Sequence, residues 1–162
     1  MGTVIGIGVD LEEVSRVERV FSSPKALARV FTAHEIAYCQ PKRRRFQHLA
    51  VRFAAKEAVF KALGTGLSGG LHWTDAEVRN EPSGKPHLLL SGPAKALADR
   101  LGSTPSWCRC RTVAGTPSLK SCCWAAALPR DLTTMPERHA SGSRRPEGFP
   151  EENTWPCQIN LS

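Results

Sequence analysis

The periodic pattern of apolar residues in this chain stops at Gly102, and that break limits how much of the chain can build a core. Residues 1–102 alternate apolar segments with turn signals, whereas residues 103–162 hold five of the six cysteines, seven of the twelve prolines and three of the four tryptophans. Because a buried face needs regular apolar spacing, we predict a folded domain at 1–102 and a separate tail at 103–162. The Pro, Ser, Gly and Arg content of 129–157 predicts disorder.

The folded part contains both helical and extended patterns. Thr32 with Glu35 forms a capping box that opens a helix, and the Gly64-Thr65-Gly66 turn ends the longest helix. These signals together predict an α+β fold. The expected elements are a strand at 3–9, helices at 12–21, 25–30, 32–39, 46–63 and 93–101, and strands at 72–79 and 87–91.

Length and charge narrow the class of protein. The chain of 162 residues suits one domain, and none of its apolar runs reaches the ~18 residues of a membrane span. Its first residues lack the basic segment of a signal peptide. We therefore expect a cytoplasmic protein with no membrane partner.

The net charge of +7 raises the question of an acidic partner. Residues 42–45 form a basic turn that a nucleic-acid patch or a localisation signal would also contain. Only one aromatic residue lies close to this turn in the sequence, so nucleic-acid binding ranks below the alternatives developed below.

Two carboxylates stand where a metal site could form. Asp10 follows a buried strand, and Glu57 lies inside the longest helix. Hard oxygen ligands from different elements suit Mg²⁺ when phosphates complete its coordination shell. The alternative interpretation is structural, with Glu57–Lys61 as a surface i,i+4 ion pair and Asp10 as a strand-end cap. Charge for a polyphosphate would come from Arg45, Arg52, Lys56 and Lys61.

Two segments resemble a known enzyme family. GIGVDLEEVSRVERV at residues 6–20 and RFAAKEAVFKALGTGL at residues 52–67 are similar to the two signature regions of holo-[acyl-carrier-protein] synthase. This family is the small, homotrimeric type of 4′-phosphopantetheinyl transferase. The resemblance covers residues 3–102 and implies a small antiparallel sheet packed against a long helix.

The resemblance also implies a reaction in fatty acid biosynthesis. The 4′-phosphopantetheine arm of coenzyme A moves to a serine of an acyl carrier protein, and adenosine 3′,5′-bisphosphate leaves. The family's Mg²⁺ ligands correspond to Asp10 and Glu57, and Glu57, acting through a metal-bound water, is the candidate base. Lys61 would steady the leaving group. The expected coenzyme A contacts are Arg45, Arg52, Lys56, Lys61, Gly64, Thr65 and Gly66.

The acyl carrier protein is the partner that the resemblance implies for the basic residues. Carrier proteins are acidic, and members of the family dock them through arginines of the first helix, which correspond to Arg16 and Arg19. Complementary charge would raise the encounter rate. The alternative for Arg16 and Arg19 is an ordinary solvated helix face.

The sequence departs from the family after Leu101. A strand with a V-S-L-S-H motif and a final apolar strand should follow, but the chain reads GSTPSWCRCRTVAGTPSLKSCCW at residues 102–124. The family's histidine and serine line the coenzyme A site, and the missing strand completes the sheet and the trimer. We therefore expect the last strands to be missing. Cys108, Cys110, Cys122 and Cys123 lack the CxxC pairs of a structural zinc site.

A single-base deletion near the codon for Gly102 is our hypothesis for this departure. Codons compatible with residues 102–112, read with one added G, translate as G-V-D-A-V-L-V-S-L-S-H, which is the expected family strand. The second functional hypothesis follows from this loss: a catalytically impaired protein that still binds coenzyme A or a carrier protein.

Overall fold

The α+β architecture predicted from the sequence is confirmed by a computed structural model, which describes residues 4–102, 104–112 and 119–127, with side chains described for 6–102. These residues belong to one compact unit, Met1–Arg130. The segment 129–157, for which we predict disorder, lies outside the described residues. The elements are β1 (Val4–Glu13), α1 (Val14–Val20), α2 (Pro24–Val30), α3 (Ala33–Cys39), α4 (Arg45–Ala62), a 3₁₀ turn (Trp73–Asp75), β2 (Ala76–Asn80), β3 (Pro86–Leu90), α5 (Gly92–Arg100), β4 (Thr104–Thr112) and β5 (Leu119–Ala127).

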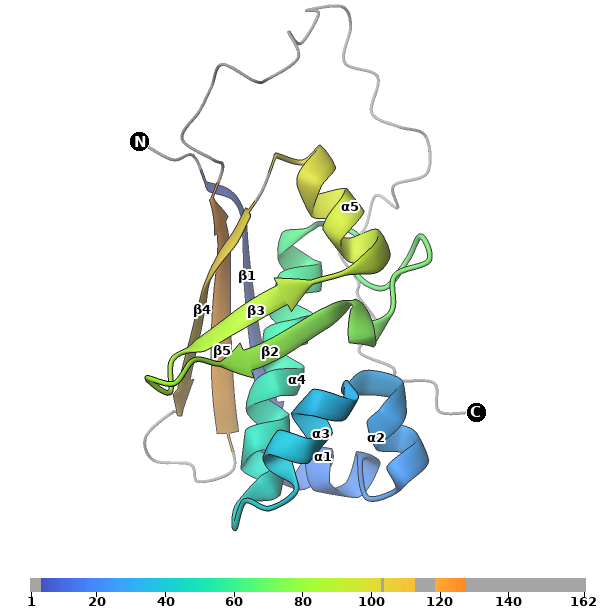
Figure 1. Cartoon of the computed structure of the whole chain (residues 1–162), viewed down its shortest axis with the longest axis vertical. Coiled ribbons are helices and arrows are strands. Elements are labelled where there is room, and N and C mark those ends of the chain that lie inside the picture. The colour runs from blue at the N-terminus through green and yellow to red at the C-terminus, as the bar shows by residue number, and fades with distance from the viewer. Residues whose placement is uncertain (1–3, 103, 113–118, 128–162) are drawn as a thin grey trace, which may run out of the picture. The chain divides into compact units, whose positions relative to one another are not determined.

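Helix α4 is the central element of the fold. It contacts β1 and β5 of the three-stranded sheet, as well as β2 of the separate β2–β3 hairpin. Figure 1 shows the short helices α1–α3 gathered near the beginning of α4 and the hairpin running across it. The rings of Phe53 and Phe60, both on α4, pack against the ring of Trp73, at centroid distances of 5.1 and 5.7 Å.

Strand β1 has two different faces because successive side chains of a strand alternate. Gly8, Asp10 and Glu12 are buried, and the strand contacts α4 along its length. On the other face, Ile7, Val9 and Leu11 are 69%, 51% and 58% exposed. The exposed apolar side chains of Ile7, Val9 and Leu11 therefore point away from the core, whereas the acidic side chains of Asp10 and Glu12 are covered.

Two glycines allow β1 and α4 to approach closely. A Cβ atom on Gly8 would overlap the carbonyl oxygen of Ala58, and one on Gly6 would overlap that of Ala62. The obstacle in both cases is helix backbone, which cannot rotate away as a side chain could. The Gly6-Ile7-Gly8 segment is thus a close-packing motif of strand and helix.

Strand β1 is longer than the sequence predicts. Its pairing with β5 continues as far as Glu13 opposite Leu119, so residues 12 and 13, expected to begin a helix, are extended instead. Helix α1 then starts at Val14 without a side-chain cap. By contrast, the capping box of Thr32 and Glu35 is present as predicted, with both reciprocal hydrogen bonds formed.

The structure corrects the expectation that the closing strands are missing. β4 and β5 lie beyond Gly102, and the antiparallel sheet has the order β1-β5-β4. The pairing uses backbone groups, which any residue except proline can supply. The one proline in these strands, Pro105, lies next to a register irregularity. The side chains of β4 and β5, including their four cysteines, lie outside the description.

Candidate active site

Asp10 and Lys61 meet where β1 lies against α4. The Lys61 Nζ atom donates a hydrogen bond of 2.7 Å to Asp10 Oδ1. The Asp10 side chain is only 7% exposed, whereas that of Lys61 is 36% exposed. Lys61 therefore reaches from partly solvated helix surface to a buried carboxylate. Both residues are predicted from the sequence as site residues, and the structure brings them together.

Glu57 joins this pair from the preceding turn of α4. Burial raises the pKa of Glu57, the negative charge of Asp10 raises it further, and Lys61 and Arg16 lower it. These influences show that Glu57 shares the electrostatic environment of Asp10 and Lys61. The two candidate metal ligands from β1 and α4 are thus neighbours in the fold.

Glu12 is a fourth charged residue of this site that the sequence analysis does not identify. Its side chain is 2% exposed, and its Oε2 atom lies 3.6 Å from Arg16 Nη1. Burial raises its pKa to about 7, with Asp10 and Glu57 adding to the shift and Arg16 and Lys61 opposing it. The two-residue period of a strand, counted from Asp10, is the signal that could have placed Glu12 on the same face.

The donor set suits a hard divalent cation bound together with phosphates. Asp10 Oδ2 is buried and accepts no hydrogen bond from any described group, so one oxygen of that carboxylate remains for another ligand. Within the described residues, no three His, Cys, Asp or Glu side chains are grouped as a ready metal site. Mg²⁺ usually takes one or two carboxylates and completes its shell with water and substrate phosphates, so Asp10 with Glu57 fits it.

The turn after α4 is open enough for a phosphate to approach. Gly64 and Gly66 have φ angles of 78° and 55°, which favour glycine, and a Cβ on Gly64 would meet no atom within 4 Å. Thr65 lines a pocket of about 330 Å³ together with Ser68 and Arg100. Ser68 and Arg100 are polar residues of this region that the sequence analysis does not single out.

Lys56 does not belong to the phosphate-binding residues, and this corrects the prediction. Its side chain is fully buried, with Nζ 2.8 Å from Glu35 Oε2, and it also donates to the carbonyl oxygens of Trp73 and Ala76. Burial lowers the pKa of Lys56, while Glu35 raises it. With its ammonium group enclosed by acceptors from three elements, Lys56 holds α4 to α3 and to the hairpin.

Arg52 is likewise a structural residue in this fold. Its side chain is 4% exposed and donates hydrogen bonds to Asn80 Oδ1 and to the carbonyl oxygen of His48, at 2.6 and 3.3 Å. The guanidinium also lies 4.2 Å from the centroid of the Tyr38 ring. These contacts face α3 and β2, so the predicted contact between Arg52 and coenzyme A is not supported.

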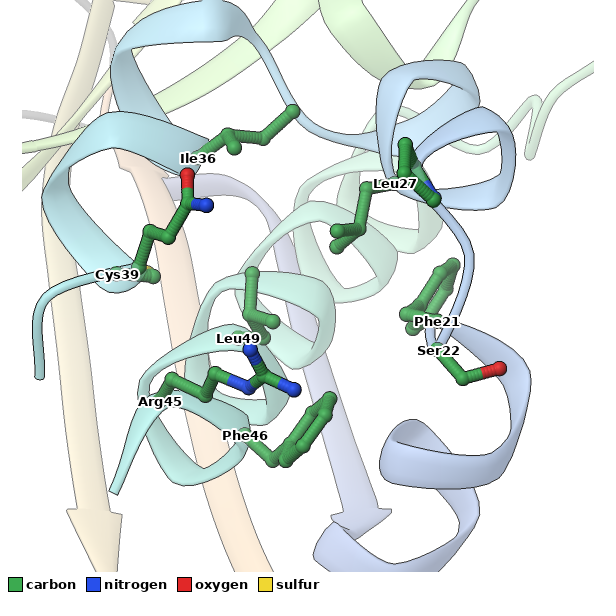
Figure 2. A pocket seen from close by; sticks show the side chains of 10 residues that line it. Phe21, Ser22, Leu27, Ile36, Cys39, Arg45, Phe46 and Leu49 are labelled. Atoms are coloured by element: carbon green, nitrogen blue, oxygen red, sulfur yellow. The ribbon is translucent and has the colours of Figure 1, made fainter. Parts of the chain in front are cut away.

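Arg45 lies at the beginning of α4, beside an apolar pocket. Its guanidinium stacks 4.5 Å from the centroid of Phe46. Figure 2 shows both side chains at the pocket, which measures about 160 Å³ and is also lined by Phe21, Leu27, Ile36 and Leu49. Cys39 is part of the wall, and burial raises the pKa of its thiol to about 11, so this pocket contains no reactive thiolate at neutral pH.

The remaining predicted arginines lie on α1 or at its end. Arg16 is near the carboxylates through Glu12, and its side chain is 35% exposed. Arg19 is an exposed residue in the last turn of α1, two residues before Phe21 of the apolar pocket. Arg16 therefore lies beside a carboxylate of the site, and Arg19 is close in sequence to the residues that line the pocket.

Comparison with known proteins identifies the family to which this chain belongs. The sequence profile of the 4′-phosphopantetheinyl transferase superfamily matches residues 6–114, which is more than half of the chain. The chain belongs to this superfamily. The matched segment contains Asp10, Glu57 and Lys61, so the superfamily assignment covers the whole carboxylate site.

Within the superfamily, the chain is similar to holo-[acyl-carrier-protein] synthases, which confirms the resemblance seen in the sequence. It is 48% identical to the holo-[acyl-carrier-protein] synthase of Geotalea daltonii over 101 residues, which are 61% of this chain and 81% of that protein. The sequence similarity thus leaves about two fifths of this chain unmatched.

Solved structures of superfamily members extend the similarity further along the backbone. The acyl carrier protein synthase of Plasmodium yoelii, solved with ADP bound, matches with a TM-score of 0.68 at 28% identity, over 80% of this chain and 98% of that one. The Bacillus anthracis synthase, in complex with CoA (3′,5′-ADP), matches with a TM-score of 0.61 at 27% identity, over 78% and 98%. Because residues 1–102 are less than two thirds of the chain, these matches include backbone beyond Gly102.

No helix among the described residues is both long and apolar enough to cross a membrane.

Proposed function

We propose that this chain transfers the 4′-phosphopantetheine group of coenzyme A to a serine of an acyl carrier protein, with Mg²⁺, as a cytoplasmic enzyme of fatty acid biosynthesis. The observation that carries the proposal is the meeting of Asp10, Glu57 and Lys61 where β1 lies against α4. It is supported by the superfamily to which the chain belongs and by the relatives named as holo-[acyl-carrier-protein] synthases.

In this proposal, Asp10 and Glu57 hold the cation and Lys61 binds the diphosphate of coenzyme A. A bound Mg²⁺ supplies positive charge that offsets the phosphate oxygens and aligns them for an in-line displacement. Lys61 already contacts Asp10 and keeps a partly exposed side chain, so its ammonium can face a phosphate oxygen. The N–H groups of the Gly64–Gly66 turn are further donors for those oxygens.

The reaction breaks one phosphorus–oxygen bond and forms another. The serine oxygen of the carrier protein attacks the β-phosphorus, and the bridging oxygen leaves with adenosine 3′,5′-bisphosphate. The serine proton goes to a base, and we propose that Glu57 takes it through a water molecule.

Transfer of radiolabelled phosphopantetheine from coenzyme A to apo-acyl carrier protein tests this function directly. We expect Mg²⁺-dependent labelling by the full chain and a loss of at least about 100-fold in Asp10→Ala and in Glu57→Ala. Asp99→Ala is the control, since Asp99 forms an exposed ion pair on α5 with Lys95. Full activity in either site variant would refute the metal assignment.

For the carrier protein, we propose docking on α1 and the adjoining apolar pocket. Arg16 and Arg19 offer positive charge to an acidic helix, and the pocket lined by Phe21, Leu27 and Phe46 offers space for an apolar side chain. Surface charges of this kind mainly raise the association rate. Arg19→Glu should therefore raise KM for the carrier protein and leave kcat nearly unchanged in the same assay.

We also propose that the enzyme is a homotrimer in contact through the outer face of β1. Ile7, Val9 and Leu11 form an exposed apolar row on this strand. Soluble monomers seldom leave adjacent large apolar side chains uncovered along a strand. The trimer is the assembly that the family resemblance implies.

A second candidate is a protein that binds coenzyme A or the carrier protein without turnover. It is favoured by one observation: the match to the Geotalea daltonii synthase covers only 61% of the chain, and the match to the superfamily profile ends at residue 114. The motif absent from residues 102–112 is the one whose histidine and serine line the coenzyme A site in the family. Retained binding of coenzyme A without labelling of the carrier protein would identify this second function.

A further inference from the structure

Helix α4 carries charged side chains on two neighbouring faces. Glu57 and Lys61 are four residues apart and share one face, from which Lys61 bonds to Asp10. Arg52 and Lys56 are also four residues apart, and they share the next face. Successive residues of an α-helix are turned by about 100°, so a rotation of α4 about its axis moves both faces together. The contacts that fix Lys56 therefore also fix the direction of Glu57.

Lys56 is held by three other elements. Its Nζ atom lies 2.8 Å from Glu35 Oε2 of α3, and it donates to the carbonyl oxygens of Trp73, at 3.0 Å, and Ala76. An ammonium group has three N–H donors, and three acceptors face this one. Because the side chain is fully buried, water cannot replace a lost contact. Lys56 thus joins α4 to α3, to the 3₁₀ turn and to β2.

The carboxylate that binds Lys56 is itself attached to backbone. Glu35 is fully buried, and it accepts hydrogen bonds from the N–H groups of Thr32, at 2.9 Å, and Val78, at 3.0 Å. Thr32 caps α3, and Val78 lies in the middle of β2. Backbone groups of packed elements cannot rotate away as side chains can, so Glu35 gives α4 a fixed point of attachment.

Strand β1 limits the distance to α4 but not the rotation of the helix. Interlocking side chains normally select the orientation of a packed helix, whereas β1 presents Gly6 and Gly8 to the backbone of Ala62 and Ala58. At the radius of the side chains, a rotation of about 10° moves an atom by about 1 Å. Metal–ligand distances tolerate only about 0.2 Å. The site thus needs a contact elsewhere on α4 that fixes this rotation.

We propose that Lys56, anchored by Glu35, is the positioning residue that fixes the rotation of α4 and so holds Glu57 toward the cation site at Asp10. This inference rests on the metal assignment proposed above and deepens it. Lys56 acts through the helix that carries Glu57, without a contact of its own to the cation or to phosphate. Arg52 supports the same attachment one turn earlier, through its hydrogen bond to Asn80 of β2.

The test is Mn²⁺ binding to the full chain, measured from the electron paramagnetic resonance of free Mn²⁺ at a temperature where circular dichroism shows each variant to be folded. We expect Lys56→Met to weaken Mn²⁺ binding by about tenfold, the scale at which residues behind the ligands act. Leu88→Ala is the control for lost stability, because it empties a buried core position of β3. Its affinity for Mn²⁺ should stay close to that of the wild-type chain.

A double variant separates positioning from stability. Lys56→Met combined with Glu35→Gln leaves no charge buried without a partner, so much of the stability lost in Lys56→Met should return. Methionine donates no hydrogen bond to the carbonyl oxygens of Trp73 and Ala76, so α4 still lacks its attachment. We therefore expect the double variant to bind Mn²⁺ about tenfold more weakly than the wild-type chain, even though it is folded.

Two results would overturn the inference. Wild-type affinity in the folded double variant would show that Lys56 contributes stability alone, and an equal loss of affinity in Leu88→Ala would show that any destabilisation weakens the site. In both cases, loss of Mn²⁺ binding in Asp10→Ala would leave the metal assignment intact. Absence of Mn²⁺ binding in the wild-type chain, by contrast, would overturn the metal assignment together with the inference.

Discussion

Glu12 links the stability of the chain to pH. Burial, together with Asp10 and Glu57, raises its pKa from 4.5 to about 7, so the folded state keeps this proton to a higher pH than the unfolded state does. The free energy of unfolding should therefore be highest below about pH 4.5 and fall as the pH rises to about 7, by about 3 kcal/mol in total from this group.

Urea unfolding between pH 4.5 and 8, in EDTA, measures this slope. Because other groups titrate in the same range, the informative quantity is the difference between the wild-type chain and Glu12→Gln. The difference should grow with pH in favour of the glutamine variant, and parallel curves would contradict the prediction.

Two lysines of the second signature region should respond differently to the same substitution. Lys56→Met leaves the buried Glu35 carboxylate without its cation and should lower the free energy of unfolding by about 3–5 kcal/mol. Lys61→Met removes the partly exposed partner of the buried Asp10 carboxylate and should cost about 1–3 kcal/mol, while phosphopantetheine transfer is lost. Urea unfolding and the transfer assay separate the two effects; equal destabilisation by both changes would argue against this division of roles.

At the scale of the elements, the contact between β1 and α4 holds the site together. A methyl group on Gly8 would overlap the backbone of Ala58, so Gly8→Ala should destabilise the chain by about 3 kcal/mol or more, the upper range for overpacking. Thermal unfolding checks this value. Glu13→Ala, an exposed position on the same strand, is the control and should change the melting temperature little.

Some elements of the fold could be predicted from the sequence, and others could not. Helix α4 and the capping box at Thr32 depend on local signals, namely apolar spacing and a cap, and both are present as predicted. The different roles of Lys56 and Lys61 depend on the contact of Lys56 with Glu35. Glu35 belongs to another element, so no local sequence pattern reveals this contact. Likewise, β4 and β5 form against a backbone partner, so their own irregular sequence gives no indication of them.

For the whole molecule, the outer face of β1 predicts assembly. Val9→Asp places a charge in the middle of the exposed apolar row and should convert a trimer into monomers, as measured by sedimentation velocity. Because Val9 points away from the core, the variant monomer should keep the helical content of the wild-type chain. A wild-type chain that already sediments as a monomer would refute the proposed trimer.

Beyond Gly102, the structural match to the family extends further along the chain than the sequence match, which for the superfamily profile ends at residue 114. The structural match to the Plasmodium yoelii synthase covers 80% of the chain, whereas the sequence match to the Geotalea daltonii synthase covers 61%. Repeated resequencing around the codon for Gly102 tests the deletion hypothesis, and codons that cannot yield the V-S-L-S-H frame would exclude it. If the hypothesis holds, restoring one base should raise transfer activity.

The spacing of Asp10 and Glu57 follows from the contact of two backbones, since Gly6 and Gly8 lie directly against Ala58 and Ala62. No side chain intervenes, so gradual exchange of core residues by mutation would leave that spacing almost unchanged. Natural selection for the metal site would instead act on the two glycines themselves. Deep mutational scanning should accordingly find positions 6 and 8 intolerant of every replacement. The carboxylate site should also be retained while many substitutions accumulate in the C-terminal part of the chain.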